Sequence, residues 1–320
     1  MNILTASGIA TEIKQHFEEN LRQSVSEDEF IKESCTPLIK GGKRLRPMLF
    51  LLCAKYGKNF SPEKIMPLAI ALELIHTASL VHDDILDNSK KRRGIETANS
   101  KYGAQVAVLI GDYLFAKAFQ IVAEGGYGDE VKLILSNLVQ NLCRGEIMQD
   151  LSLFHVPTIS EYYTRINLKT AIFLSACCKI GGIVAGLKHE EIDGLSVYGN
   201  SLGLAFQIVD DLLDFFGDEK VTGKSLGSDL KSGVITLPVI RALKVSRDAD
   251  VLHQMITRRI MDRDEIHSAV KIVRVSDAFN YCRLRATAHI ESARISLPQI
   301  KNSVQLALEQ AADFVVMRNA

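Results

Sequence analysis

The chain has 320 residues, of which 47% are apolar and 24% are charged, as is typical of soluble globular proteins with a sizeable buried core. Basic and acidic residues number 38 each, so no net charge draws the protein to nucleic acid or to an anionic membrane. The six cysteines form no C-x-x-C pair and are expected to be reduced core residues. Because the beginning of the chain lacks a signal-peptide pattern and charges interrupt every long apolar run, we expect a cytoplasmic protein without a transmembrane segment.

Helices are expected along most of the chain. It contains only seven prolines and 21 glycines, and apolar residues recur at spacings of three and four. Breaks marked by glycine or proline fall at 41–42, 57–62, 93–94, 125–128, 155–158, 217–227, 233 and 297–298. No linker or low-complexity tract divides the chain, so we predict one large all-α domain over residues 1–320.

The first basic motif, GGKRLRP, covers residues 41–47. Its glycine pair can end one helix, and Pro47 suits the first turn of the next. Between them lie the cations of Lys43, Arg44 and Arg46, and arginine offers a planar fork to phosphate oxygens. The motif predicts an anion site.

The next helical pattern ends in an acidic cluster. Positions i and i+4 share a helix face, so Asp83 and Asp87 point in the same direction, whereas Asp84 lies about 100° round the helix. His76 lies about two turns earlier on the same helix. It is placed to hydrogen-bond a diphosphate other than one bound at the acidic cluster, although a lone histidine is more often structural.

A second acidic cluster repeats this pattern after another apolar helical run. Asp210 and Asp214 share one face, and Asp211 lies to the side. Oxygen ligands without histidine or cysteine suit magnesium, which takes one or two carboxylates together with substrate phosphates and waters. One such cluster alone could be a solvated acidic surface, but two clusters after apolar runs favour a metal and diphosphate site in which they face each other across a bundle.

Further basic and polar residues are weaker signals. Arg92 and Arg93 follow the first acidic cluster closely enough to reach over a bound diphosphate. Lys169 and Thr170 interrupt an apolar helical pattern, and Lys224 lies in a glycine-marked loop after the second cluster. Each fits solvated surface when taken alone, and together they favour the same diphosphate site.

The chain resembles the trans-isoprenyl diphosphate synthases, which make farnesyl, geranylgeranyl and longer polyprenyl diphosphates, through ordered motifs over roughly residues 35–240. These motifs are GGKRLRP at 41–47, LIHTASLVHDDILD at 74–87, KRRG at 91–94, GDYLF at 111–115, GEIMQD at 145–150, KTA at 169–171, FQIVDDLLDF at 206–215, GKSLGSDL at 223–230 and TLP at 236–238. Long-chain members such as heptaprenyl and octaprenyl diphosphate synthases are the ones it resembles.

The resemblance implies a bundle of long, mostly antiparallel helices around a central cavity, in a homodimer that in some members needs a small partner subunit. It implies magnesium ions, three with a bound diphosphate, on Asp83, Asp87 and Asp210, with Asp84, Asp211 and Asp214 in support. Arg92, Lys169 and Lys224 would hold the allylic diphosphate, and Gly42, Lys43, Arg46, His76 and Arg93 the isopentenyl diphosphate. Thr170 and Gln207 would steady the developing carbocation.

One residue departs from the family pattern. Many members carry lysine where this chain has Val234, which removes one possible phosphate contact.

The length of the product can be argued from the helix that carries Asp83, because the growing tail runs along it away from the metal ions. Ala78 and Ser79, five and four positions earlier, are small where short-chain members carry an aromatic residue. A helical turn rises about 5.4 Å, close to one isoprene unit, so we predict a product of about six to eight units. The next residues that could form a floor are Ile75, Leu72, Phe115 and Phe119.

Three alternatives remain at this point. An aromatic side chain from another helix beside Ala78 would favour a short-chain synthase that makes farnesyl or geranylgeranyl diphosphate. A non-catalytic subunit of a two-component synthase would have no reason to keep six costly carboxylates. A terpene cyclase usually replaces the second acidic cluster with a different pattern, which is absent here.

Overall fold

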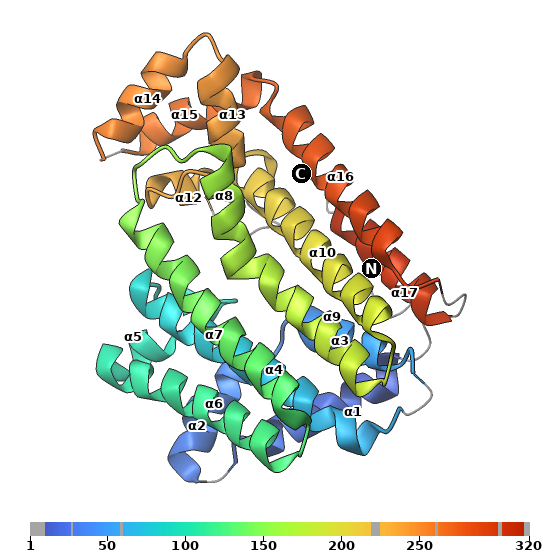
Figure 1. Ribbon diagram of the computed structural model, residues 1–320. Coiled ribbons are helices and arrows are strands. Elements are labelled where there is room, and N and C mark those ends of the chain that lie inside the picture. The colour runs from blue at the N-terminus through green and yellow to red at the C-terminus, as the bar shows by residue number, and fades with distance from the viewer. Residues whose placement is uncertain are drawn as a thin grey trace. The chain divides into compact units, whose positions relative to one another are not determined.

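The structure is a computed structural model that describes residues 10–26, 28–57, 60–218, 225–259, 262–299 and 303–316. These residues are almost entirely helical (Figure 1), so the prediction of an all-α fold is confirmed. Within these ranges the strands are confined to a two-residue hairpin, β1 (Lys91–Arg92) with β2 (Ile95–Glu96).

The first half of the chain contains α1 (Ala10–Gln23), α2 (Glu29–Ile39), α3 (Leu45–Ala54), α4 (Pro62–Leu86), α5 (Ala98–Tyr102), α6 (Ala104–Glu124) and α7 (Gly128–Leu151). The second half contains α8 (Ile159–Ile166), the π-helical turn η2 (Asn167–Ala171), α9 (Ile172–Val184), α10 (His189–Phe216), α12 (Ser228–Lys231), α13 (Leu237–Val245), α14 (Ala249–Thr257), α15 (Arg263–Val275), α16 (Ala278–Ser296) and α17 (Ser303–Val316).

Local sequence explains where several helices begin. Pro62 occupies the first turn of α4, where its missing N–H costs nothing. Thr158 and Glu161 form a reciprocal capping box at the start of α8, as Asp262 and Glu265 do at α15. These caps satisfy backbone N–H groups that the first helical turn leaves without partners.

The described residues form two compact units. The first falls within Met1–Val139, Ala176–Ile192 and Gln299–Leu308, and the second within Gln140–Ser175, Asp193–Pro298 and Glu309–Ala320. Helices α7 and α10 each contribute residues to both units. The assignment of residues 1–320 to one domain therefore stays a prediction.

In the first unit α4 packs closely against α6. Helix α4 is buried over most of its length, as expected for a helix that is apolar on all sides. Gly111 of α6 makes the close approach possible, because a Cβ atom there would lie 2.1 Å from Nε2 of His82. The fit of these two helices depends on a glycine at that point.

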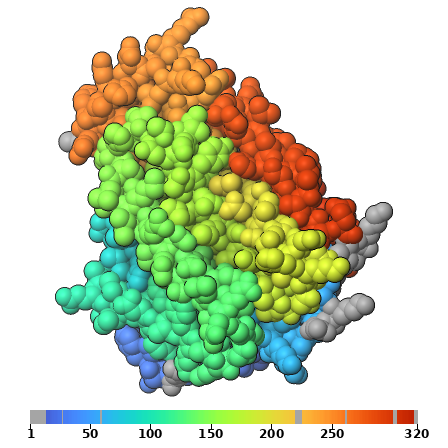
Figure 2. Space-filling model, in the orientation of Figure 1, coloured from blue at the N-terminus to red at the C-terminus, as the bar shows by residue number. Residues whose placement is uncertain are grey.

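In the second unit the helices after residue 228 enclose a core of their own. Helices α13, α14 and α15, coloured orange, pack together at one end of this unit (Figures 1 and 2). The core includes Phe215, Leu230, Ile235, Val239, Leu252, Ile256 and Val273, all fully buried. Phe215 belongs to α10, so this core reaches the end of the helix that carries the second acidic cluster.

Three described helical stretches are long and apolar enough to cross a membrane when judged by length and composition, namely Pro62–Leu86, Ala104–Glu124 and Ile159–Val184. In the first, 72% of the most apolar window is buried inside the fold, so its apolar side chains serve the core. The corresponding share for Ala104–Glu124 is only 33%. The expected absence of a transmembrane segment therefore stays a prediction.

Candidate active site

The basic motif of the first unit lies in a strained loop between α2 and α3. Gly41, Gly42 and Arg44 have φ values of 78°, 94° and 52°, in the left-handed region that favours glycine. Gly42 lies directly against the side chain of Arg93, because a Cβ atom at residue 42 would come within 2.6 Å of the Nη1 atom of Arg93. Two residues predicted to bind isopentenyl diphosphate are thus brought together.

Arg44 does not belong to the predicted anion site. Its guanidinium is buried and donates from Nε and Nη2 to the two carboxylate oxygens of Glu18, at 2.7 and 2.9 Å, and from Nη1 to Oε1 of Glu73 at 2.5 Å. Its Nη2 also donates to the backbone oxygen of Ile39. Because carboxylates and a carbonyl occupy this guanidinium, only Lys43 and Arg46 of the motif remain candidates for phosphate binding.

Arg46 and His76 form the next part of this site. Nη1 of Arg46 lies 3.2 Å from Nε2 of His76, which is three residues after Glu73 on α4. Burial, followed by the positive charges of Arg46 and Arg93, holds the pKa of His76 well below its ordinary value. Burial also lowers the pKa of Arg46 and of Arg93. This cluster of cations disfavours further positive charge and would be stabilised by an anion.

The first acidic cluster occupies the end of α4. Asp83 is partly buried, and Asp87 is the exposed C-cap residue. Asp84 is 4% exposed and accepts hydrogen bonds from Nε of Arg92 to its two oxygens, at 2.9 and 3.0 Å. Burial raises the pKa of Asp84, although Arg92 opposes that shift. Asp84 thus holds the hairpin that carries Arg92 and Arg93 against α4.

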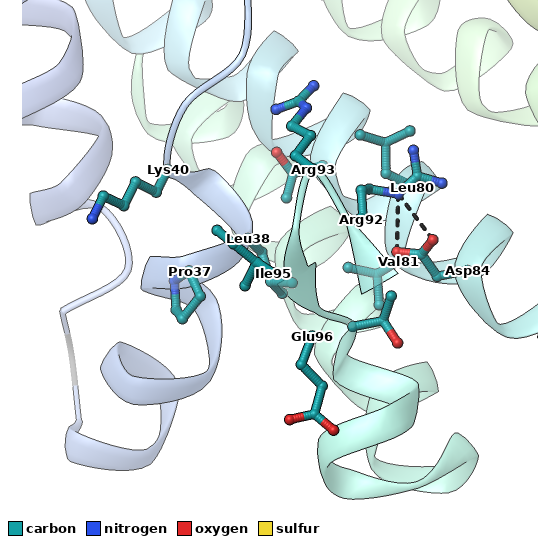
Figure 3. Close-up of a pocket in the computed structure, with 12 residues that line it drawn as sticks. Pro37, Leu38, Lys40, Leu80, Val81, Asp84, Arg92, Arg93, Ile95 and Glu96 are labelled. Carbon is teal, nitrogen blue, oxygen red and sulfur yellow. Dashed lines mark hydrogen bonds and ion pairs between the residues drawn. The ribbon is translucent and has the colours of Figure 1, made fainter. Parts of the chain in front are cut away.

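Figure 3 shows the small pocket beside this ion pair. The side chains of Leu38 and Ile95 meet at its apolar side, and the dashed lines join Arg92 to Asp84. Lys40 points away from the ion pair. The wall between the end of α2 and the hairpin is therefore apolar, with the charges at one edge.

The residues predicted to control product length lie on α4 and α6. Leu72, Ile75 and Ala78 are fully buried. Ser79 is partly exposed, and its hydroxyl donates to the backbone oxygen of His76 at 2.9 Å. The ring of Phe115 on α6 lies 5.8 Å from that of His82 between centroids, and Phe119 is partly buried one turn further along α6.

In the second unit Lys169 and Thr170 lie on the π-helical turn η2. Nζ of Lys169 is 2.6 Å from Oε2 of Glu146, and the hydroxyl of Thr170 donates to Oε1 of Gln207 at 2.7 Å. A π-helical turn inside a helix is frequent at functional sites. The pairing of Thr170 with Gln207 brings together the two residues expected to steady a carbocation.

Asp211 is fully enclosed by protein donors. Its Oδ1 accepts from Nε2 of Gln207 at 2.8 Å, and its Oδ2 accepts from the hydroxyl of Tyr162 at 2.7 Å. Burial raises the pKa of Asp211 to about 6, although the two hydrogen bonds lower it. Burial, with Asp211 as its neighbour, raises the pKa of Tyr162 well above its ordinary value. Tyr162 therefore stays protonated and donates.

The other two carboxylates of the second cluster differ from each other. Asp210 is exposed. Asp214 accepts from the backbone N–H of Ser228 at 3.0 Å, from its hydroxyl at 2.6 Å and from the backbone N–H of Asp229 at 3.2 Å. Asp214 thus holds the start of α12. Val234 is anchored through its backbone N–H, which donates to the oxygen of Asp229 at 2.9 Å.

The donors at the ends of α4 and α10 are all carboxylate oxygens, which suits magnesium. Among the described residues, no three His, Cys, Asp or Glu side chains lie close enough together to hold a metal ion by themselves. Each of these two donor sets fits an ion whose coordination is completed by diphosphate and water. Lys224 lies outside the residues that the structure describes.

Sequence reasoning missed Glu73, Glu146 and Tyr162. Glu73 carried a signal, because a carboxylate within the apolar run of α4 must find a partner when that run is buried. Glu146 lies within the motif GEIMQD, but the sequence did not reveal its partner or that of Tyr162, because both partners are far away along the chain.

Comparisons with known proteins agree with this fold. The model of the family named polyprenyl synthetase matches residues 28–273. A short chain isoprenyl diphosphate synthase of Methanocaldococcus jannaschii is 36% identical over 96% of this chain and 94% of its own. Component 2 of heptaprenyl diphosphate synthase from Geobacillus stearothermophilus is 42% identical over 72% of each chain. The crystal structure of heptaprenyl diphosphate synthase from Staphylococcus aureus matches with a TM-score of 0.89 and 32% identity, covering 97% of this chain and 98% of that one.

The chain therefore belongs to the polyprenyl synthetase family. It is an isoprenyl diphosphate synthase, a prenyltransferase, as the resemblance of its motifs predicted.

Proposed function

We propose that the protein condenses an allylic diphosphate with isopentenyl diphosphate to give a trans-polyprenyl diphosphate of about six to eight isoprene units, as the rise of α4 per turn suggests. The observation that carries this proposal is the cationic cluster around His76. Arg46 lies beside His76, and Arg93, which lies against Gly42, also acts on it electrostatically. His76 is on the same helix as Asp83, and Asp87 is the C-cap of that helix. A diphosphate would supply the negative charge that these cations favour, and its oxygens would also coordinate metal ions held by the carboxylate pair.

Magnesium would be held by the carboxylate oxygens of Asp83 and Asp87 at the end of α4 and of Asp210 on α10, and we expect three ions when diphosphate is bound. When bound, magnesium would supply positive charge that stabilises the departing diphosphate. Asp84, Asp211 and Asp214 accept hydrogen bonds from protein donors. They have the supporting role that the family resemblance implies.

The chain's own cations divide the two substrates between them. Lys43, Arg46, His76 and Arg93, with Gly42, hold isopentenyl diphosphate. Arg92, Lys169 and Lys224 hold the allylic diphosphate, and in the structure Arg92 and Lys169 already contact carboxylates. Diphosphate binding would share or exchange these ion pairs, because the planar fork of arginine and the ammonium of lysine bind phosphate oxygens as well as carboxylate oxygens. Thr170 and Gln207 steady the carbocation that develops on the allylic substrate.

The long product is supported by the small residues Ala78 and Ser79 on α4 and by the heptaprenyl synthases among the similar proteins. The similarity to a short chain isoprenyl diphosphate synthase favours the alternative, a farnesyl or geranylgeranyl product. The two alternatives share one reaction and differ in the floor of the cavity.

A homodimer is part of this proposal, and a small partner subunit is a further possibility because one similar protein is named as a component. The support comes from large apolar side chains on the surface of α6 and the start of α7, where Leu109 and Leu133 are 66% and 61% exposed. We propose a cytoplasmic location, since the substrates are charged and water-soluble.

The test incubates the purified chain with farnesyl diphosphate, labelled isopentenyl diphosphate and magnesium, and resolves the products by length. Asp83→Ala and Asp210→Ala are expected to abolish product, while Asp129→Ala, an exposed carboxylate paired only on the surface of α7, serves as the matched control. Removal of magnesium by a chelator should stop the reaction. Absence of product with the unchanged chain, also after addition of a candidate small subunit, would refute the proposal.

A further inference from the structure

A chain of three hydrogen bonds connects side chains from α8, η2 and α10. Tyr162 donates to Asp211 at 2.7 Å, Gln207 donates to Asp211 at 2.8 Å, and Thr170 donates to Gln207 at 2.7 Å. Tyr162 and Asp211 are buried, and Tyr162 is the innermost member. Charge-assisted bonds of this length to a carboxylate are among the stronger hydrogen bonds in proteins.

The chain has a defined direction. The carboxylate of Asp211 only accepts, so it binds the NH₂ group of Gln207 and leaves the carbonyl oxygen Oε1 on the opposite side. That oxygen accepts the one hydroxyl proton of Thr170. The hydroxyl oxygen of Thr170 therefore presents lone pairs, and no proton, to any group that approaches it.

The hydroxyl of Tyr162 completes this arrangement. It occupies Oδ2 of Asp211, so that Oδ1 faces Gln207. The ring of Tyr162 is itself held in place by the buried guanidinium of Arg165, 5.9 Å from its centroid, and by the ring of Tyr163 at 5.5 Å. The carboxylate of Asp211 is thus held by a tyrosine whose ring is itself packed in place.

We propose that Tyr162 and Asp211 are positioning residues that lock the amide of Gln207 in one orientation, so that Gln207 and Thr170 present oxygen lone pairs to the cationic end of the prenyl chain. The inference rests on the proposed function and adds two residues that act through Gln207. A reversed amide would present NH₂ protons to the cation and would oppose its formation.

The decisive comparison is between Tyr162→Phe and Tyr163→Phe. The first removes one buried hydroxyl and keeps the ring, and the second makes the same change at the neighbouring, partly exposed tyrosine. Binding is measured by calorimetry with two probes, farnesyl diphosphate and an analogue of it that carries a tertiary ammonium in place of the branched allylic carbon. Thermal unfolding of both variants checks that they are folded.

We expect Tyr162→Phe to weaken binding of the ammonium analogue about fivefold more than binding of farnesyl diphosphate, as for the net loss of one typical hydrogen bond. Tyr163→Phe should affect both probes equally. In a Gln207→Leu background the selective loss caused by Tyr162→Phe should disappear, because the tyrosine acts through the amide.

The following results would overturn the inference. Equal weakening of both probes by Tyr162→Phe, or the same selective loss with leucine at residue 207, would show that the tyrosine does not act through the amide. If the unchanged chain binds neither probe in the presence of magnesium, the proposed function itself fails and the inference fails with it. If the unchanged chain binds both probes and Tyr162→Phe weakens the two equally, the inference fails while the proposed function stands.

Discussion

At the scale of single residues, neighbouring cations of the first unit have different partners. Arg44 and Arg46 are two positions apart, yet Arg44 is held by Glu18 and Glu73 while Arg46 contacts His76. Removing one partner of a buried ion pair leaves an uncompensated charge, which is strongly destabilising. Arg44 therefore fixes the loop from which Lys43 and Arg46 can reach an anion.

The neutral state of His76 leads to a pH-dependent stability. Because its pKa in the fold lies below that in the unfolded chain, a proton binds the unfolded chain more tightly. The stability that the fold has while His76 is neutral is fully present above the ordinary pKa of about 6.5 and is lost as the pH falls below it. In the absence of diphosphate, the free energy of unfolding of the unchanged chain should fall about 1 kcal/mol more than that of His76→Gln between pH 7.5 and 5.5.

Urea unfolding of both proteins at the two pH values measures this difference. The other histidines contribute equally to both proteins, so the comparison isolates residue 76. Parallel losses of stability would contradict a neutral, half-buried His76.

At the scale of elements, the contact between α4 and α6 depends on Gly111, where His82 occupies the space that a side chain would need. Gly111→Ala should lower the free energy of unfolding by about 1–3 kcal/mol, because the new methyl group displaces a ring packed between two helices. In a His82→Ala background the loss should shrink below about 1 kcal/mol, since the obstacle is gone.

Urea unfolding of the two single variants and the double variant provides the measurement. An equal loss in both backgrounds would mean that the glycine is required for some reason other than the approach of His82.

At the scale of the whole molecule, the identity of the product depends on the space along α4. Ser79 is partly exposed and lies on the same helical face as Asp83. Ser79→Phe should shorten the product to about three or four isoprene units, because the ring fills the turn next to the reaction site and a turn corresponds to about one unit.

Product lengths from the labelled assay decide this prediction. Ser100→Phe, which places the same ring on the exposed surface of α5, is the control and should leave the distribution unchanged. Unchanged lengths with phenylalanine at residue 79 would place the floor of the cavity on other helices.

Local sequence was enough to predict the helical class, several of the helix boundaries and the shared face of each acidic pair. These are local properties: glycine and proline at 41–42, 57–62 and 125–128 end helices wherever the chain is placed, and residues i and i+4 share a face in any helix. The break at Gly186, which separates α9 from α10 with a left-handed φ of 69°, was missed because a single glycine in an apolar run fits a continuous helix equally well.

Only the tertiary structure decided which partner each charged or polar side chain meets. Arg44 and Glu18 are 26 positions apart, Thr170 and Gln207 are 37 apart, and Tyr162 and Asp211 are 49 apart. No periodic pattern joins such pairs, because their distance in space depends on how whole helices pack. For that reason the sequence could name candidate carboxylates, whereas the donors that hold Asp84, Asp211 and Asp214 became known only from the structure.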